Sequence, residues 1–217
     1  MAEDPLRGAI QPFRQRHGRI LTAALEVFSR SSFGGATTGE IASRAHVSKR
    51  DLYADFPDKH AILVAVVEMV LHTGEENIER VVADSSQTVR SLEKKLEIIG
   101  LALMSEILSP VTGFVSRLVT SEALEQPRIG ALYFDNWYTR RNQLIAQVFS
   151  KHVARPNQRP RRPGDASQAA KHYVALVTQL PQLTVSVGML EMWNQKSIEA
   201  HVRNAVERLL KAYPTFV

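Results

Sequence analysis

The stretch ATTGEIASRAHVSKRDLYADFPDKHA, residues 36–61, decides the fold of this 217-residue chain. Thr37 followed three residues later by Glu40 is a capping box, which predicts the start of a helix. Ser48 followed by Asp51 repeats the pattern and predicts a second helix, which stops at the next proline. Two short amphipathic helices with a tight joint form a helix-turn-helix, the motif whose second helix can enter the major groove of DNA.

The outer face of the second predicted helix is polar. It carries Lys49, Arg50, Asp51, Tyr53, Ala54 and Asp55. Two cations, a phenolic ring and a small side chain suit a DNA groove, and an ordinary solvated helix face would have the same composition. Lys59 falls in the first turn of the next predicted helix, where the macrodipole disfavours a cation by about 0.3–1 kcal/mol. Either a phosphate bound at that helix terminus makes the position of the cation favourable, or the long lysine side chain carries the charge into water.

These motifs resemble those of the TetR family of one-component transcriptional regulators, over roughly residues 14–66. In chain order, they are a first helix ending in an aromatic residue and glycines, then Thr37-Thr38-x-x-Ile41-Ala42, Val47-Ser48-Lys49, Leu52-Tyr53-x-x-Phe56 and Pro57-x-Lys59. The resemblance implies an all-α fold. In that fold, a three-helix DNA-binding domain with the helix-turn-helix is joined by a long helix to a C-terminal helical bundle for regulation and dimerisation.

The resemblance also implies DNA contacts. Thr38, Ser48, Tyr53 and Lys59 would hold the phosphate backbone, and the first residues of the second helix would face base edges. The expected DNA-binding residues are Thr37, Thr38, Ser48, Lys49, Arg50, Asp51, Tyr53, Ala54 and Lys59. Two positions depart from the family pattern. His46 stands where Gly is usual, so a positive φ is expected at a residue that tolerates it better than most. Asp55 stands where His is common and is left out of the contacts.

Helical periodicity extends through most of the chain. It covers residues 14–33, 38–45, 49–55, 59–82, 88–108, 111–124, 128–152, 166–190 and 197–212, with a joint expected at 84–86. No stretch alternates as a strand would, so the sequence itself favours an all-α protein. The expected organisation is a flexible arm (1–13), the helix-turn-helix domain (14–58) and a ligand-binding and dimerisation domain (59–217), with a flexible Pro- and Arg-rich linker at about 154–165.

The last two predicted helices offer a seam for a homodimer, which would read the two half-sites of a palindromic operator. They are rich in small and β-branched residues, and two such pairs would form a four-helix bundle. The expected interface residues are Val174, Val177, Thr184, Val187, Ile198, Val202, Val206 and Leu209. The alternative is that these residues only close the core of the monomer.

The middle of the chain is where this family holds a small effector. On the predicted helix over 128–152, Tyr133, Trp137 and Arg140 share one stripe, so a cation interrupts an apolar face, as in a site for an amphipathic ligand. An ion pair between Arg140 and a carboxylate on a neighbouring helix explains the stripe equally well. The expected ligand-binding residues are Met104, Leu108, Phe114, Tyr133, Trp137 and Arg140.

Composition and missing motifs limit the other classes of function. The net charge of +5 permits a nucleic-acid partner without establishing one. The chain has no cysteine, which excludes a thiol nucleophile and a Cys-ligated metal. It contains no P-loop and no GxSxG or HExxH motif. We therefore expect no catalytic residue, no metal and no cofactor. Without a signal peptide or an apolar run long enough to span a bilayer, a cytoplasmic protein with no membrane partner is expected.

Three classes of function remain for the sequence. The first is a sequence-specific regulator that binds double-stranded DNA, most simply a repressor that a small-molecule effector releases from its operator. The second is a helical module that binds a small molecule or a protein and has lost DNA binding. The third is an enzyme on a helical scaffold. Binding to duplex DNA that weakens steeply with salt would separate the first class from the second.

Overall fold

The chain folds into helices throughout the part that the structure, a computed structural model, describes, which is residues 15–153 and 165–216. The helices are α1 (Arg16–Gly35), α2 (Thr38–Arg44), α3 (Lys49–Asp55), α4 (Lys59–Thr88), α5 (Leu92–Ile107), α6 (Pro110–Glu122), α7 (Pro127–Tyr133), the π-helix η1 (Phe134–Arg140), α8 (Arg141–Val153), α9 (Asp165–Ser186), the 3₁₀ turn η2 (Leu190–Met192), α10 (Gln195–Ala212) and the 3₁₀ turn η3 (Pro214–Phe216). The predicted all-α fold is confirmed. The arm expected at 1–13 and the linker expected at 154–165, apart from Asp165, lie outside the described residues.

Contacts divide the chain into two units. The first takes the residues up to His72 together with Pro110–Tyr133, and the second takes Thr73–Ser109 and the residues from Phe134 onward. The helix α4 therefore contributes to both units, so the contacts divide the chain elsewhere than after residue 58.

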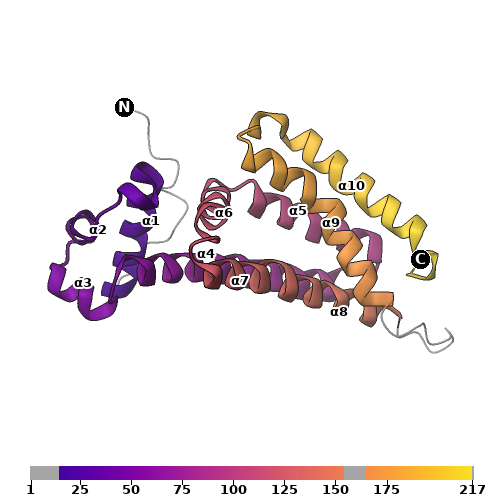
Figure 1. Cartoon of the computed structure of the whole chain (residues 1–217). Helices are drawn as coiled ribbons and strands as arrows, with labels where there is room; N and C mark the ends of the chain where they lie inside the picture. Colours follow the sequence, from indigo (N-terminus) through magenta and orange to yellow (C-terminus); the bar gives the residue numbers. More distant parts are fainter. Residues whose placement is uncertain (1–14, 154–164, 217) are drawn as a thin grey trace. The chain divides into compact units, whose positions relative to one another are not determined.

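The first unit gathers α1, α2 and α3 around the start of α4 (Figure 1). The helices α2 and α3 have only seven residues each, so their stability comes from the apolar face that each contributes to a shared core. The largest fully buried members of this core include Ile20, Leu25, Phe28, Ile41, Leu52, Ile62 and Leu63. This small core fixes α2 against α3 and leaves the polar face of α3 outside.

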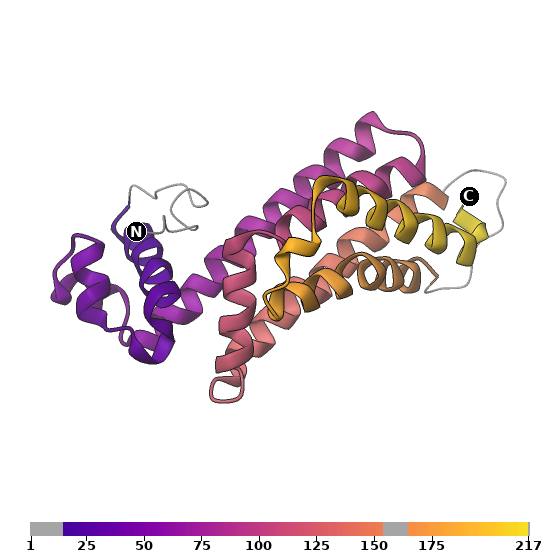
Figure 2. The same cartoon turned by 90° about the horizontal axis from the view of Figure 1, so that it is seen from above.

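The second unit is a bundle in which α5 contacts α9 and α10, and α8 packs along α9 (Figure 2). Tyr173, whose side chain is completely buried in its core, carries a hydroxyl. That hydroxyl donates to the carbonyl oxygen of Leu96 at 2.5 Å, which satisfies the polar atom inside the core.

Two predicted helix boundaries are wrong. The joint expected at 84–86 does not form, because α4 continues to Thr88. Its serine and threonine hydroxyls donate back to helix carbonyls, Ser85 to Val82 at 3.1 Å and Thr88 to Asp84 at 2.7 Å, so they stay inside the helix instead of ending it. The single helix expected over 128–152 is interrupted by the π-helix η1, which inserts an extra residue per turn and shifts the faces that follow it.

Candidate nucleic-acid interface

The second helix of the first unit begins and ends on local hydrogen bonds. At its start, the Thr37 side chain accepts from the backbone N–H of Glu40 at 3.1 Å. At its end, the N–H of Val47 bonds to Ala42 O at 3.0 Å and the N–H of His46 to Ser43 O at 3.2 Å. These two bonds form a Schellman motif, which requires a left-handed residue at the joint. His46 has φ 54°, so the predicted positive φ is confirmed.

The recognition helix α3 has its own cap. The Ser48 hydroxyl accepts from the N–H of Asp51 at 3.0 Å and donates to Asp51 Oδ2 at 2.6 Å. The hydroxyl bond from Ser48 is the largest of the effects that hold the pKa of Asp51 below its ordinary value, and the charge of Arg16 adds to it. Asp51 therefore stays an anion at the start of α3.

Thr38 and Tyr53 bring the start of α2 beside α3. Their hydroxyl oxygens lie 2.9 Å apart, and Tyr53 is 50% exposed. If the hydrogen bond between these two hydroxyls breaks, each hydroxyl can donate to an oxygen of the same phosphate. The structure thus brings together two of the residues expected at the DNA backbone, from two different helices.

The cations and the small residue expected at base edges lie on the outside of the unit. Lys49, Arg50 and Ala54 are exposed. The side chain of Lys49 covers Gly39 in the first turn of α2, where an added Cβ would lie 3.0 Å from Lys49 Cε. Arg50, in the first turn of α3, is the other exposed cation of this helix.

Asp55 pairs with a residue that the sequence analysis did not single out. Arg16, in the first turn of α1, donates from Nε to Asp55 Oδ2 at 2.9 Å and from a second nitrogen to Oδ1, and a third nitrogen lies 3.7 Å from Asp51. These bonds from Arg16 are the main cause of the lowered pKa of Asp55. The available signal was the unusual anion at the end of α3, but no local pattern links it to a cation 39 residues away.

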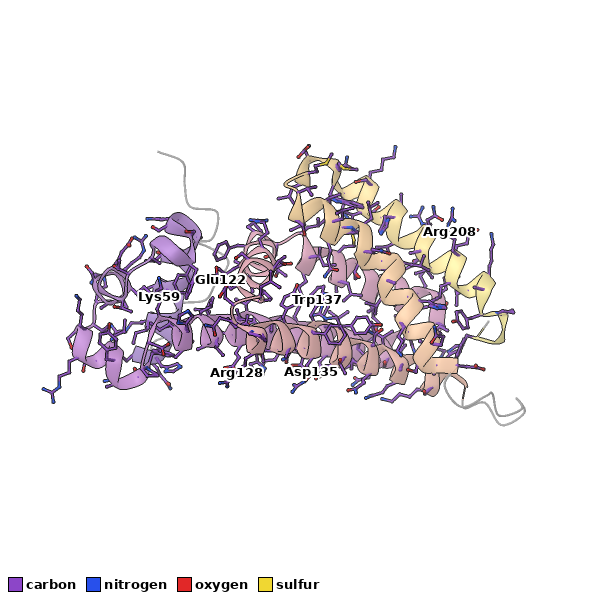
Figure 3. The ribbon with its side chains drawn as sticks, in the orientation of Figure 1. Lys59, Glu122, Arg128, Asp135, Trp137 and Arg208 are labelled. Atoms are coloured by element: carbon purple, nitrogen blue, oxygen red, sulfur yellow. The ribbon has the colours of Figure 1, made fainter. Side chains whose placement is uncertain are left out.

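Lys59 has partners other than a phosphate. Its ammonium donates to the carbonyl oxygens of Phe33 at 2.7 Å, Ala36 at 2.9 Å and Gly34 at 3.3 Å, and Figure 3 labels it at the start of α4. It also lies 4.6 Å from the centre of the Phe33 ring. An ammonium has three donors, so these carbonyls occupy Lys59 and give it a structural role at the C-terminal end of α1. The ammonium thus binds backbone carbonyls of its own chain, a partner that the sequence analysis did not predict.

The stripe expected on the predicted helix 128–152 is shifted by the π-helix. Trp137 is buried in the second unit, but Arg140 is exposed and pairs with Glu75 at 3.3 Å and Asp135 at 3.7 Å. The next residue, Arg141, is the buried cation. In Figure 3 the labelled Asp135 and Trp137 lie on the same stretch of η1. Arg140 therefore does not lie on the apolar face, and it forms the expected alternative, an ion pair with a carboxylate on a neighbouring helix, Glu75 of α4.

Arg141 forms a buried ion pair with Glu106 of α5. Two guanidinium nitrogens donate to the two carboxylate oxygens at 2.7 and 2.8 Å, and the side chains are 4% and 9% exposed. The guanidinium lies 3.8 Å from the centre of the Trp137 ring. Glycine at position 74 makes room for the carboxylate, because an added Cβ would lie 2.2 Å from Glu106 Oε1. Bidentate geometry and stacking together compensate the loss of water around both charges.

The other residues expected at a ligand site fall in different units. Met104 is fully buried in the core of the second unit, and Leu108 packs against that core. Phe114 and Tyr133 belong to the first unit and are half-buried. Within the second unit, a cavity of about 30 Å³, enough for one water molecule, is lined by Glu75, Ile78, Glu79, Asn136, Arg140, Arg141 and Leu144.

Most of the residues expected at the dimer interface are inside the monomer. Val174, Val177, Thr184, Val202, Val206 and Leu209 are buried in the second unit. Their assignment to the interface is wrong, because α9 and α10 turn these faces toward α5, α8 and each other. Ile198 is half-buried, and Val187 alone of the eight is exposed.

A different face of α9 is apolar and exposed. Four residues at a spacing of three or four, between 40% and 60% exposed, form what we call the α9 stripe: Leu176, Leu180 and Leu183 of α9, and Val187 directly after its end. Exposed apolar residues continue it further along the chain: Met189, Leu190 and Met192. Contiguous exposed apolar side chains of this kind mark interaction surfaces.

Over the described ranges, no group of three or more His, Cys, Asp or Glu side chains is placed to hold a metal ion. Within the same ranges, no single helix has both the length and the apolar composition of a membrane span, and only α5 and α6 taken together, as a bent pair, reach them.

Solved structures share this fold. A TetR-family transcriptional regulator from Mesorhizobium loti MAFF303099 superimposes with a TM-score of 0.82 at 23% identity, covering 91% of this chain and 96% of that one. The flavonoid-responsive regulator FrrA gives 0.70 at 20% identity, with coverages of 91% and 96%. The helix-turn-helix and the helical bundle of this chain are thus the fold of these solved structures.

Sequence comparison identifies the family. Residues 20–66 match the model of bacterial regulatory proteins of the tetR family, and residues 94–215 match that of the C-terminal domain of AefR-like transcriptional repressors. The chain belongs to the TetR family of transcriptional regulators.

Individual relatives match over shorter spans. The regulator RutR of Escherichia coli K12 is 44% identical over 52 residues, and the transcriptional activator FasR of Mycolicibacterium smegmatis is 36% identical over 88 residues. The match spans 24% of the length of RutR and 40% of that of FasR.

Proposed function

We propose that this protein binds an operator in double-stranded DNA as a homodimer and represses transcription until a small-molecule effector releases it. Family membership supports DNA-binding regulation. Repression is a separate part of the proposal, since the relative FasR is an activator. The observation that carries the DNA-binding part is the surface formed by the Thr38 and Tyr53 hydroxyls, 2.9 Å apart, beside the exposed Lys49 and Arg50 of α3.

This surface has the chemistry of both kinds of DNA contact. Hydroxyls donate to phosphate oxygens and fix the position of a protein on the duplex, without reading sequence. An arginine near the start of a recognition helix reads guanine through O6 and N7. Thr37, Ser48 and Ala54 are exposed as well, so the proposed site contains residue types for both the phosphate contacts and the base contacts.

The experiment is selection of a duplex from a randomised pool, followed by binding measurements on the selected and a scrambled duplex at two salt concentrations. We expect tight binding of the selected duplex and weaker, more salt-dependent binding of the scrambled one. Failure to retain any duplex at low salt would contradict the proposal. Transcription from a promoter that carries the selected duplex then separates repression from activation.

The dimer is proposed to form through the α9 stripe. Each copy would bury leucines that are otherwise 40–59% exposed, and a two-fold axis would place the same stripe of both copies face to face. Half-sites one helical turn apart require two recognition helices, which one chain does not provide.

The effector is proposed to bind the second unit near Trp137. This residue is one of two tryptophans in the chain. Its ring already stacks on the guanidinium of Arg141, so an entering molecule that separates them changes the surroundings of the indole. Tryptophan fluorescence in a Trp193→Phe variant therefore reports on Trp137 alone. An effector that releases DNA without changing this fluorescence would place its site elsewhere.

A further inference from the structure

The first turn of α1 contacts both ends of the recognition helix. Arg16 forms the bidentate pair with Asp55 in the last turn of α3 and lies 3.7 Å from Asp51 in its first turn. Beside it, the His17 ring lies 4.6 Å from that of Phe56, the residue that caps α3. Two adjacent residues of α1 thus hold α3 by an ion pair and by an aromatic contact.

The charges of α3 make this contact significant for DNA. The helix carries Lys49 and Arg50, and against them Asp51 and Asp55, so its formal charge is zero. The two carboxylates are four residues apart and share one face of the helix. Carboxylates that approach the phosphates of DNA without a cation are repelled. Arg16 supplies the cation that faces both.

We propose that Arg16 is a positioning residue for DNA recognition: it fixes α3 against α1 and compensates Asp51 and Asp55, so that a recognition helix without net charge can approach the duplex. The inference rests on the proposed function and adds a residue of α1 to the DNA-binding machinery. Arg16 acts through α3. Its guanidinium is directed to the two carboxylates, and the bidentate geometry restricts the rotation of its side chain.

The competing possibility is a direct contact between Arg16 and a phosphate, since its side chain is 46% exposed. The two roles differ in how they depend on Asp55. If Arg16 compensates Asp55, removing both charges together restores the balance on the face of α3. If Arg16 binds a phosphate, removing Asp55 as well cannot replace the missing contact. A double-mutant cycle therefore separates them.

The test compares four variants of the full chain: Arg16→Gln, Asp55→Asn, the double variant, and Arg19→Gln as the matched control. Arg19 is an exposed cation in the same part of α1, and it is not among the partners found for Asp51 or Asp55. Binding is measured by fluorescence anisotropy on the duplex selected by the unaltered protein and on its scrambled counterpart. Amide hydrogen exchange of residues 49–55 is measured without DNA.

We expect Arg16→Gln to weaken binding of the selected duplex roughly tenfold and to speed exchange in α3. Asp55→Asn alone and the double variant should stay within about threefold of the unaltered protein, and Arg19→Gln likewise. If the double variant binds as weakly as Arg16→Gln, the inference is overturned in favour of a phosphate contact. If Arg19→Gln loses as much affinity as Arg16→Gln, the effect comes from the net charge of the protein and the inference is also overturned. Unchanged hydrogen exchange of α3 in Arg16→Gln would overturn the inference about Arg16, whether or not the protein binds DNA. Failure of the unaltered protein to bind any duplex would instead refute the proposed function.

Discussion

Lys59 and Phe33 are joined twice, by a hydrogen bond from the ammonium to the Phe33 carbonyl at 2.7 Å and by the position of the same ammonium 4.6 Å from the centre of the Phe33 ring. Carbonyls at the end of a helix lack intrahelical partners, and a cation there also meets the negative end of the macrodipole. Lys59, in the first turn of α4, therefore supplies hydrogen-bond donors to the carbonyls at the end of α1. The segment it holds leads directly into Thr37 and α2.

Replacing Lys59 by Met keeps most of the stem and removes the charge. We expect the free energy of unfolding to fall by about 1.5–3 kcal/mol, because the Phe33 and Ala36 carbonyls lose a charged donor. Urea unfolding measures this. Lys49→Met, at an exposed position, is the control and should change stability by less than about 0.5 kcal/mol. Unchanged stability together with a flatter salt dependence of DNA binding would instead make Lys59 a phosphate contact.

His46→Gly should stabilise the first unit by about 0.5–1 kcal/mol. A left-handed backbone costs a residue with a Cβ about 1–2 kcal/mol, and the greater freedom of glycine in the unfolded chain offsets part of the gain. Ala45→Gly, one residue earlier at φ −76°, is the opposite control and should destabilise. Thermal unfolding compares the two. Destabilisation by both would show that the His46 side chain contributes more than its backbone strain removes.

Arg50→Ala should weaken binding to the selected duplex by about 1–3 kcal/mol and binding to scrambled duplex by less, because a base contact is lost. Arg203→Ala, an exposed cation on α10, is the control for net charge. Titrations on both duplexes measure the ratio. An equal loss on both would assign Arg50 to the phosphate backbone. An ion pair with Asp55 would keep Arg50 away from the bases, but Asp55 is paired with Arg16 in the structure.

Adjacent arginines of η1 and α8 should differ sharply in their effect on stability. Arg141→Met leaves Glu106 as a buried charge without its partner and should destabilise by about 3–5 kcal/mol. Arg140→Met removes an exposed pair and should change stability by at most about 1 kcal/mol. Chemical denaturation of the two variants measures the difference. Similar losses in both would mean that the π-helix does not shift the register as described.

Leu183→Glu should convert the dimer to monomers, since it places a charge at the centre of the α9 stripe, where Leu183 is 59% exposed. Because the residue is exposed in the monomer, folding should be preserved. Light scattering gives the mass, and circular dichroism confirms the helices. Leu124→Glu, at a residue 90% exposed in the first unit, is the control and should leave the mass unchanged. A dimer that survives Leu183→Glu would place the interface on another face.

The sequence by itself determined the elements whose signals are local. Thr37 and Ser48 cap α2 and α3 as their spacing predicts, and α3 has the predicted bounds of residues 49 and 55. The positive φ of His46 follows from the tight joint between these two helices. Caps, turns and periodic apolar faces act over a few residues, so a linear reading contains the information that forms them.

Only the tertiary structure decided which faces are buried and which charges meet. Periodicity marks Val202 and Val206 as an apolar face, but an apolar face suits a monomer core and a dimer seam equally, and packing placed both in the core. One extra residue in the π-helix made Arg141, and not Arg140, the buried cation. Arg16 and Asp55 are 39 residues apart, so their contact depends on how the core of the first unit packs, which no local pattern specifies.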